Sequence, residues 1–162
     1  AENIMIVDLV RHDLGQVAVT GGVRATDLLA VRPAPGVWHL VSEVTAELPD
    51  GLPHADLIDA CFPPASVTGT PKIRAAKLLS KWEPVGRGVH CGAIGASTGE
   101  MLELNVAIRT AEFRGPGAVL HDADADAVTV EVGVGGGITI DSDPDAEWAE
   151  ILAKAAPLID PS

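Results

Sequence analysis

The order of its strand-like and helical segments most constrains what this 162-residue chain can fold into. The strand-like segments follow one another in runs, and the helical segments are inserted between these runs. Parallel sheets require strands that alternate with helices, whereas runs of strands are typical of antiparallel pairing. The order therefore predicts an α+β fold with a largely antiparallel sheet and packed helices.

The spacing of apolar residues sets the expected bounds of these segments. Helical spacing predicts helices at residues 1–14, 54–62, 71–82 and 144–159. Strand-like patterns predict strands at residues 23–32, 37–48, 88–97, 101–113, 119–120 and 127–134. The last helix has Asp141, Ser142 and Asp143 as candidate N-caps ahead of Pro144, a residue type that suits the first helical turn.

The chain is acidic, with 11 Lys and Arg against 23 Asp and Glu, which gives a net charge of −12. Such a charge repels phosphate backbones and anionic lipid, so neither nucleic acid nor a membrane surface is expected as a partner. It suits metal sites built from carboxylates as well as simple solubility. An anionic substrate would need local positive charge to overcome this field.

The two cysteines and the chain's hydropathy indicate the compartment. Cys61 and Cys91 lack the spacing of a zinc site and lie in apolar contexts, which predicts reduced thiols and a cytoplasmic protein. The sequence contains no apolar run of about 18 residues, the length that spans a membrane. It begins with Ala1 in what already looks like a helix, so we expect that it lacks its beginning.

Two carboxylates in the last helix form a candidate metal site. Glu147 and Glu150 stand three residues apart, which places both on one helix face, and Lys154 follows four residues after Glu150. Mg²⁺ takes one or two carboxylates and completes its shell with water and substrate oxygens. Glu2, in the first helix, could add a further carboxylate. The alternative is a solvated helix face with one ion pair.

Two segments could bring backbone groups to a ligand. Gly133, Gly135, Gly136 and Gly137 lie at the end of a strand, where the lack of side chains permits close approach, although a bulged strand explains them equally well. The loop at residues 63–70 offers the hydroxyls of three side chains ahead of a helix N-terminus, a position that attracts anions. A simple capping loop is the alternative. The three hydroxyl side chains are Ser66, Thr68 and Thr70.

Arg109 and His39 are polar residues in apolar strand patterns. A guanidinium in such a strand needs a carboxylate partner or a ligand, and the sequence leaves both open. His39 is either a hydrogen-bonded core residue or a proton donor.

Six segments together resemble the chorismate-utilising family, which includes component I of anthranilate synthase and of aminodeoxychorismate synthase, isochorismate synthase and salicylate synthase. They read AENIMIVDLVRHDLG, WHLVSEV, CFPPASVTGTPKIRA, GRGVHCGAIG, LNVAIRT and GVGGGITIDSDPDAEWAE. Their order covers essentially the whole chain. The resemblance implies the anthranilate synthase component I-like fold, with residues 1–162 as the C-terminal part of a single chorismate-binding catalytic domain.

The resemblance also implies roles for the candidate residues. Glu2, Glu147 and Glu150 correspond to the acidic residues around the family's Mg²⁺, which anchors the ring carboxylate of chorismate. His39 corresponds to the histidine near the departing 4-hydroxyl and is, with Lys154, a candidate catalytic residue. The implied substrate-binding residues are Ser66, Ile108, Arg109, Gly135, Gly137 and Lys154. One departure is His90, which stands where the family commonly has Tyr.

Within the family, the loop SVTGTPK resembles the aminodeoxychorismate synthase version more than the anthranilate version. The expected activity is therefore amination of chorismate to 4-amino-4-deoxychorismate, with ammonia from a glutamine amidotransferase subunit. The alternatives are the production of anthranilate, isochorismate or salicylate, or a fragment that only binds a ligand or a partner.

Overall fold

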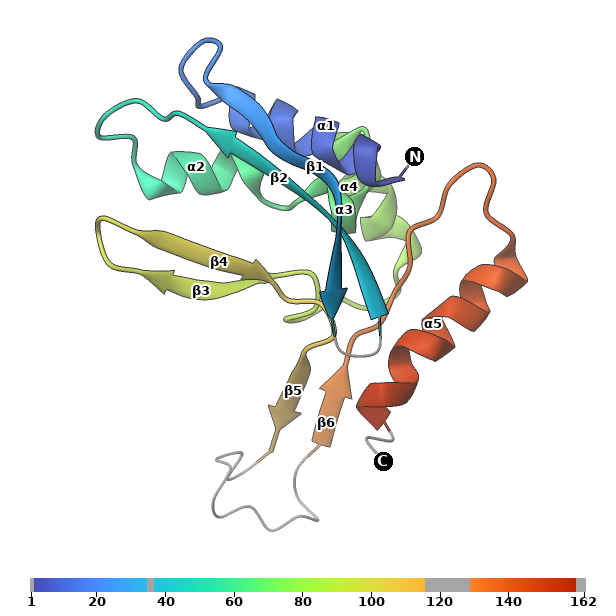
Figure 1. Cartoon of the computed structure of the whole chain (residues 1–162). Helices are drawn as coiled ribbons and strands as arrows, with labels where there is room; N and C mark the ends of the chain where they lie inside the picture. The colour runs from blue at the N-terminus through green and yellow to red at the C-terminus, as the bar shows by residue number, and fades with distance from the viewer. Residues whose placement is uncertain (1, 35–36, 116–128, 160–162) are drawn as a thin grey trace. The chain divides into compact units, whose positions relative to one another are not determined.

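The computed structural model describes residues 2–34, 37–115 and 129–159 (Figure 1). It divides into two compact units, Ala1–Leu79 and Ser80–Ser162. The predicted strand at residues 119–120 and the first two residues of the strand predicted at 127–134 lie outside the described residues.

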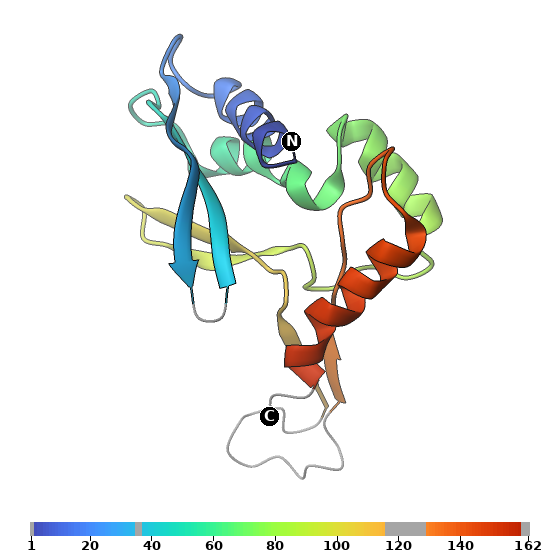
Figure 2. The ribbon, with the colours of Figure 1, turned by 45° about the vertical axis from the view of Figure 1, so that its right-hand side comes forward.

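The first unit is built on a long β-hairpin with a helix packed along it. Strands β1 (Val23–Ala34) and β2 (Val37–Ala46) pair antiparallel, and α1 (Glu2–Gly15) contacts both of them (Figure 2). The register shifts within β1, where Leu29 has a φ of 55°. The Leu29 N–H donates to the Ser42 hydroxyl at 3.0 Å, so the partner strand satisfies the donor that the irregularity frees.

Three further helices follow the hairpin: α2 (His54–Cys61), α3 (Ala65–Thr68) and α4 (Lys72–Trp82). The helices predicted at 54–62 and 71–82 are confirmed, each within one residue. The single turn of α3 was expected as loop, because four residues are too few to show helical periodicity. Three buried apolar residues of this unit lie on α1, α2 and α3, and they are Val7, Ala60 and Ala65.

The second unit contains two antiparallel strand pairs and the last helix. Strands β3 (Ala93–Ser97) and β4 (Leu102–Val106) form one pair, and β5 (Ala111–Arg114) and β6 (Thr129–Val132) form the other. All the described pairs are antiparallel, which confirms the predicted α+β class. They form two-stranded sheets and are not joined into one sheet within the described residues.

Two of the predicted strands are shorter than expected, because the backbone bends in both. The strand predicted at 101–113 is interrupted between β4 and β5, where Ala107 is buried and Arg109 has a φ of 49°. The strand predicted at 88–97 begins only at Ala93, since Cys91 has a φ of 64°. Even so, the Cys91 N–H donates to the Ala107 carbonyl at 2.8 Å, so the two bends are bonded together.

Helix α5 (Pro144–Ile159) ends the described chain and matches its predicted bounds. Of the candidate N-caps, Asp143 performs this role, because its carboxylate accepts a hydrogen bond from the Ala146 N–H at 2.9 Å. Each helix in the described part of the chain is too short or too polar to cross a membrane.

Candidate functional site

In the first unit, two hydrogen bonds hold the start of α1 against the strand that carries His39. Asn3, the neighbour of Glu2, donates from its side-chain amide to the Leu40 carbonyl at 3.2 Å. Its amide oxygen accepts a hydrogen bond from Ser42 at 2.6 Å. The first turn of α1 therefore lies beside β2 next to His39.

His39 is exposed on β2, opposite Arg32 in the strand register. The interpretation of His39 as a hydrogen-bonded core residue is therefore wrong. Its predicted role as a proton donor stays a prediction.

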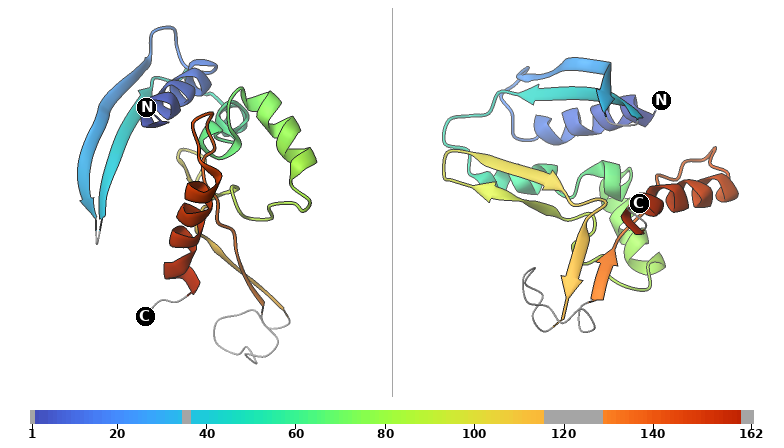
Figure 3. Two further views of the ribbon diagram at one scale, coloured as in Figure 1. Left: turned by 90° about the vertical axis from the view of Figure 1, so that its right-hand side faces the viewer. Right: turned by 60° about the horizontal axis from the view of Figure 1, so that its bottom comes forward.

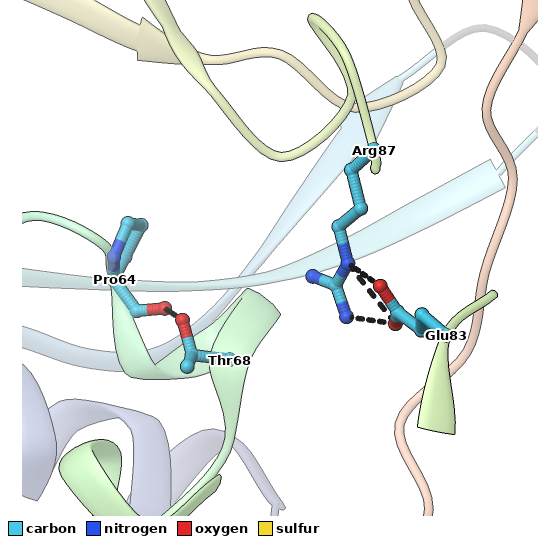
Figure 4. Close-up of polar contacts among 4 residues, drawn as sticks. All are labelled: Pro64, Thr68, Glu83 and Arg87. Carbon is cyan, nitrogen blue, oxygen red and sulfur yellow. Dashed lines mark hydrogen bonds and ion pairs between the residues drawn. The ribbon is translucent and has the colours of Figure 1, made fainter. Parts of the chain in front are cut away.

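Ser66 lies in the single turn of α3, which is closed by two hydrogen bonds. The Thr68 hydroxyl donates to the Pro64 carbonyl at 3.0 Å (Figure 4), and the Gly69 N–H donates to the Ala65 carbonyl at 2.7 Å. Gly69 has a φ of 105°, which favours glycine and turns the chain sharply towards α4. Ala65 is buried and Ser66 is exposed, so the loop presents the Ser66 hydroxyl to solvent.

In the second unit, the two predicted metal-binding carboxylates of α5 both have partners. Glu147 accepts a hydrogen bond of 2.5 Å from the Ser142 hydroxyl, and Glu150 forms an ion pair of 2.5 Å with Lys154. The Glu150 and Lys154 side chains are 54% and 40% exposed, so solvent weakens this pair. The ion pair expected for a solvated helix face is therefore present between Glu150 and Lys154. Both of these side chains remain accessible to a ligand.

The glycine-rich segment before α5 runs alongside this helix (Figure 3). A Cβ atom placed on Gly136 would lie 3.4 Å from a Glu147 carboxylate oxygen and 3.8 Å from the Ile151 side chain. Gly135 and Gly137 are exposed on either side of it. Glycine backbone and the Glu147 carboxylate therefore lie together on one side of the helix.

Among the described residues, no three His, Cys, Asp or Glu side chains form a cluster that could hold a metal ion. The two α5 carboxylates nevertheless supply hard oxygen ligands of the kind Mg²⁺ prefers. Glu2 belongs to the other unit. A Mg²⁺ site built from Glu2, Glu147 and Glu150 stays a prediction.

Ile108 and Arg109 lie in the interrupted segment between β4 and β5, and both are exposed. Within the described residues, Arg109 has neither a hydrogen bond nor an ion pair. The expectation of a guanidinium within a strand is wrong, because β4 ends at Val106. The Arg109 guanidinium is therefore exposed to solvent. Its backbone has a left-handed conformation, which is strained for a residue other than glycine, and strain of this kind is often found at binding sites.

A small pocket of the second unit is lined by charged and polar groups. The backbone of Gly133 forms part of its wall, and a Cβ atom there would lie 2.6 Å from both Cβ and Nδ1 of His90. The imidazole thus packs against the backbone just after β6, and only glycine fits at this position. The lining residues are Arg87, Val89, His90, Thr110, Glu112, Glu131, Val132 and Gly133.

His90 lines this pocket and has a lowered pKa. Its Nδ1 is buried without a hydrogen-bond partner among the described residues. Burial lowers the pKa of His90, the charge of Arg87 lowers it further, and Glu83 opposes both. Arg87 itself is held by Glu83, whose carboxylate accepts hydrogen bonds of 2.6 and 2.8 Å from it (Figure 4). Hydrogen bonding from Arg87 lowers the pKa of Glu83.

Two ion pairs that organise these regions were not predicted from the sequence. The pair of Glu83 and Arg87 has the i, i+4 spacing that could have revealed it. The pair of Asp13 and Lys72 joins residues 59 positions apart and left no local signal.

Comparison with known proteins identifies the family. The model of the chorismate binding enzymes matches residues 1–160. The chain belongs to this family.

Two relatives and one solved structure illustrate the match. Aminodeoxychorismate synthase component 1 of Salmonella typhimurium is 49% identical over 111 residues, which cover 68% of this chain and 24% of that protein. Anthranilate synthase component 1 of Neisseria meningitidis is 36% identical over 160 residues, which cover 98% of this chain and 30% of that protein. The crystal structure of anthranilate synthase component I from Streptococcus pneumoniae superposes with a TM-score of 0.75 at 30% identity, covering 96% of this chain and 33% of that one.

The chain therefore spans about a quarter to a third of the length of these relatives. The chorismate-binding fold expected from the six segments is confirmed.

The pocket around His90 predicts a pH dependence. Since the pKa of His90 is lowered from 6.5, stability from the neutral imidazole is fully present above pH 6.5 and is lost as the pH falls through the folded-state pKa. NMR titration of the complete protein should give a His90 pKa below 6.5. Arg87→Gln should raise this value and Glu83→Gln should lower it, because their charges act in opposite directions. The same shift in both variants would contradict this account.

Proposed function

We propose that the complete protein catalyses the magnesium-dependent amination of chorismate to 4-amino-4-deoxychorismate, with ammonia from a glutaminase partner. The observation that carries this choice of reaction is the 49% identity to an aminodeoxychorismate synthase component 1, against 36% to an anthranilate synthase component 1. The loop SVTGTPK around Ser66 supports the same choice. The product would supply para-aminobenzoate for folate synthesis in the cytoplasm.

A second candidate function is the formation of anthranilate. It is favoured by the anthranilate synthase relative that aligns with 98% of this chain, a larger share than the 68% of the aminodeoxychorismate synthase. The two reactions share the substrate and differ in the position of the new nitrogen, so the product distinguishes them.

The proposed substrate is a dianion. Because the chain is itself acidic, individual basic side chains must bind the carboxylates of the substrate. Arg109 suits this role because it is exposed and makes no ion pair within the described residues. Arg87, in contrast, is already neutralised by Glu83. We assign Arg109, with Ile108 beside it, to the enolpyruvyl carboxylate, since a guanidinium can bind a carboxylate through two parallel hydrogen bonds.

The remaining candidate residues divide into binding groups and proton donors. The exposed hydroxyl of Ser66 and the backbone amides of Gly135 and Gly137 would bind substrate oxygens. The 4-hydroxyl leaves as water, so the atom that departs must be protonated, and the exposed His39 is the candidate donor. Lys154 would contact the substrate once it is released from Glu150.

Glu147 and Glu150, with Glu2, would hold the Mg²⁺ of this enzyme. When bound, the ion would anchor the ring carboxylate of chorismate and withdraw charge from the adjoining diene. The Ser142 hydroxyl fixes one oxygen of Glu147, which restricts the rotamers of this carboxylate. Lys154 competes with the ion for Glu150.

The product test uses the complete protein with chorismate, Mg²⁺ and ammonium, followed by chromatography with mass detection. We expect 4-amino-4-deoxychorismate, and we expect glutamine to replace ammonium only after the glutaminase partner is added. Anthranilate as the product would favour the second candidate. Isochorismate or salicylate would indicate another member of the family, and the absence of turnover would leave only a binding function.

The metal assignment predicts the effect of Glu150→Gln. This change should abolish magnesium-dependent turnover and weaken Mg²⁺ binding measured by calorimetry, because a neutral amide is a poor substitute for a carboxylate ligand. The matched control is Asp145→Asn, which removes an exposed carboxylate from the first turn of the same helix. If both changes had the same effect, Glu150 would act only through the charge of the helix and would not be a metal ligand.

The carboxylate assignment predicts the effect of Arg109→Ala. The variant should raise the KM for chorismate about 10- to 100-fold, the loss expected for a hydrogen bond to a charged group, with a smaller change in kcat. Arg24→Ala removes an exposed arginine from β1 and should leave the KM unchanged. A normal KM in Arg109→Ala would remove this residue from the site.

A further inference from the structure

The ammonium group of Lys72 joins three segments of the first unit. It lies 2.7 Å from a carboxylate oxygen of Asp13, near the end of α1. It also donates a hydrogen bond of 3.4 Å to the carbonyl of Ala60, near the end of α2. Lys72 itself is the first residue of α4. One side chain therefore connects α1, the end of α2 and the start of α4.

The pair is protected from solvent, in contrast to the other ion pair of α1. The side chains of Lys72 and Asp13 are 23% and 9% exposed, whereas those of Arg11 and Asp8 are 51% and 68% exposed. A buried carboxylate without its partner is strongly unfavourable, so the two groups hold each other in place. Pairing also means that the charge of Lys72 is already compensated and does not attract a distant anion.

The contact of Lys72 with Ala60 closes the loop that carries Ser66, and its contact with Asp13 ties the closed loop to α1. Ala60 and Lys72 stand at the two ends of this loop, and the ammonium group draws both ends together. Within the loop, α3 is closed by its own hydrogen bonds, Ala65 is buried, and α3 contacts α1. The position of Ser66 relative to α1 thus depends on the contacts at the loop ends.

We propose that Asp13 and Lys72 form a clamp that positions Ser66 for substrate binding. The proposal rests on the proposed function, because it takes chorismate as the ligand of Ser66. Asp13 and Lys72 are positioning residues in this account and do not touch the substrate. Opening of the clamp should therefore weaken chorismate binding more than it slows the chemical step.

Cys61 provides a measure of the clamp that does not depend on activity. It follows Ala60 and is partly buried, and burial followed by the charge of Asp13 raises the pKa of its thiol, while Lys72 lowers it. If charge alone controlled its reactivity, Asp13→Asn would accelerate alkylation and Lys72→Met would slow it. If the clamp shields the thiol, both variants accelerate alkylation.

The experiment compares these variants in the complete protein. Alkylation of Cys61 by iodoacetamide is followed by peptide mass spectrometry, with Cys91 as an internal reference, and steady-state kinetics are measured with chorismate. We expect alkylation of Cys61 about tenfold faster in Asp13→Asn and in Lys72→Met, as local opening becomes more frequent. We expect the KM for chorismate to rise about tenfold, with kcat changed much less.

Three controls separate the clamp from general loss of structure. Asp8→Asn removes the exposed ion pair of the same helix and should leave both measurements unchanged. Lys72→Arg keeps the charge and should restore the KM in large part. The double variant Asp13→Leu/Lys72→Met leaves no unpaired buried charge, so it should fold even where a single variant does not, and it should still show a raised KM.

Two results would overturn the proposal in different ways. A folded variant with fast Cys61 alkylation and a normal KM would show a clamp that does not position the substrate site. Slow alkylation in Lys72→Met would show that charge alone acts on the thiol and that no clamp exists. If the wild type does not turn over chorismate, the proposed function fails and the positioning role with it, while the alkylation rates still decide whether the clamp exists.

Discussion

The ion pair between Asp13 and Lys72 is the interaction on which the first unit depends. Taking two charges out of water is costly, and their attraction compensates only when the geometry is good. Here the distance is 2.7 Å, and the Ala60 carbonyl accepts a further hydrogen bond from the ammonium group. Removing one partner of such a pair typically costs about 3–5 kcal/mol. The Lys72 ammonium group therefore holds together the end of α1, the end of α2 and the start of α4.

The second unit uses a different principle, in which glycine lets backbone and side chains approach closely. His90 packs against Gly133 at a distance that excludes any side chain there, and Glu147 lies beside Gly136. The Ser142 hydroxyl binds Glu147 and also accepts a hydrogen bond from the Thr139 N–H at 2.9 Å. The glycine-rich segment is thereby tied to the start of α5, and the Glu147 carboxylate lies beside the backbone of Gly136.

Three of the candidate residues, Ser66, Arg109 and His39, are exposed to solvent. Ser66 and Arg109 have a buried alanine close by in the chain, whereas the two neighbours of His39 are exposed. Ser66 is next to the buried Ala65, and Arg109 follows two residues after the buried Ala107. A buried neighbour restrains the backbone at Ser66 and Arg109, whereas their exposed side chains still lose rotamer freedom when a ligand binds.

The sequence by itself determined the local elements and the family. Apolar spacing and the Asp-Pro start predicted α5 within its observed bounds, because helix periodicity and capping are properties of neighbouring residues. The bends at Cys91 and Arg109 were missed, since a left-handed residue other than glycine has no signature in composition and depends on the hydrogen bond between the two segments. His39 was placed on the correct strand, but its exposure could not be read from the strand pattern alone.

Only the tertiary structure decided which charges are paired and which are available. Glu150 and Lys154 could be paired from their spacing, whereas Asp13 and Lys72 meet across 59 positions of the chain. The contact of His90 with Gly133 likewise joins distant segments, and burial lowers the pKa of the imidazole. Contacts of this kind depend on how elements pack, and packing brings together residues that have no regular spacing in the sequence.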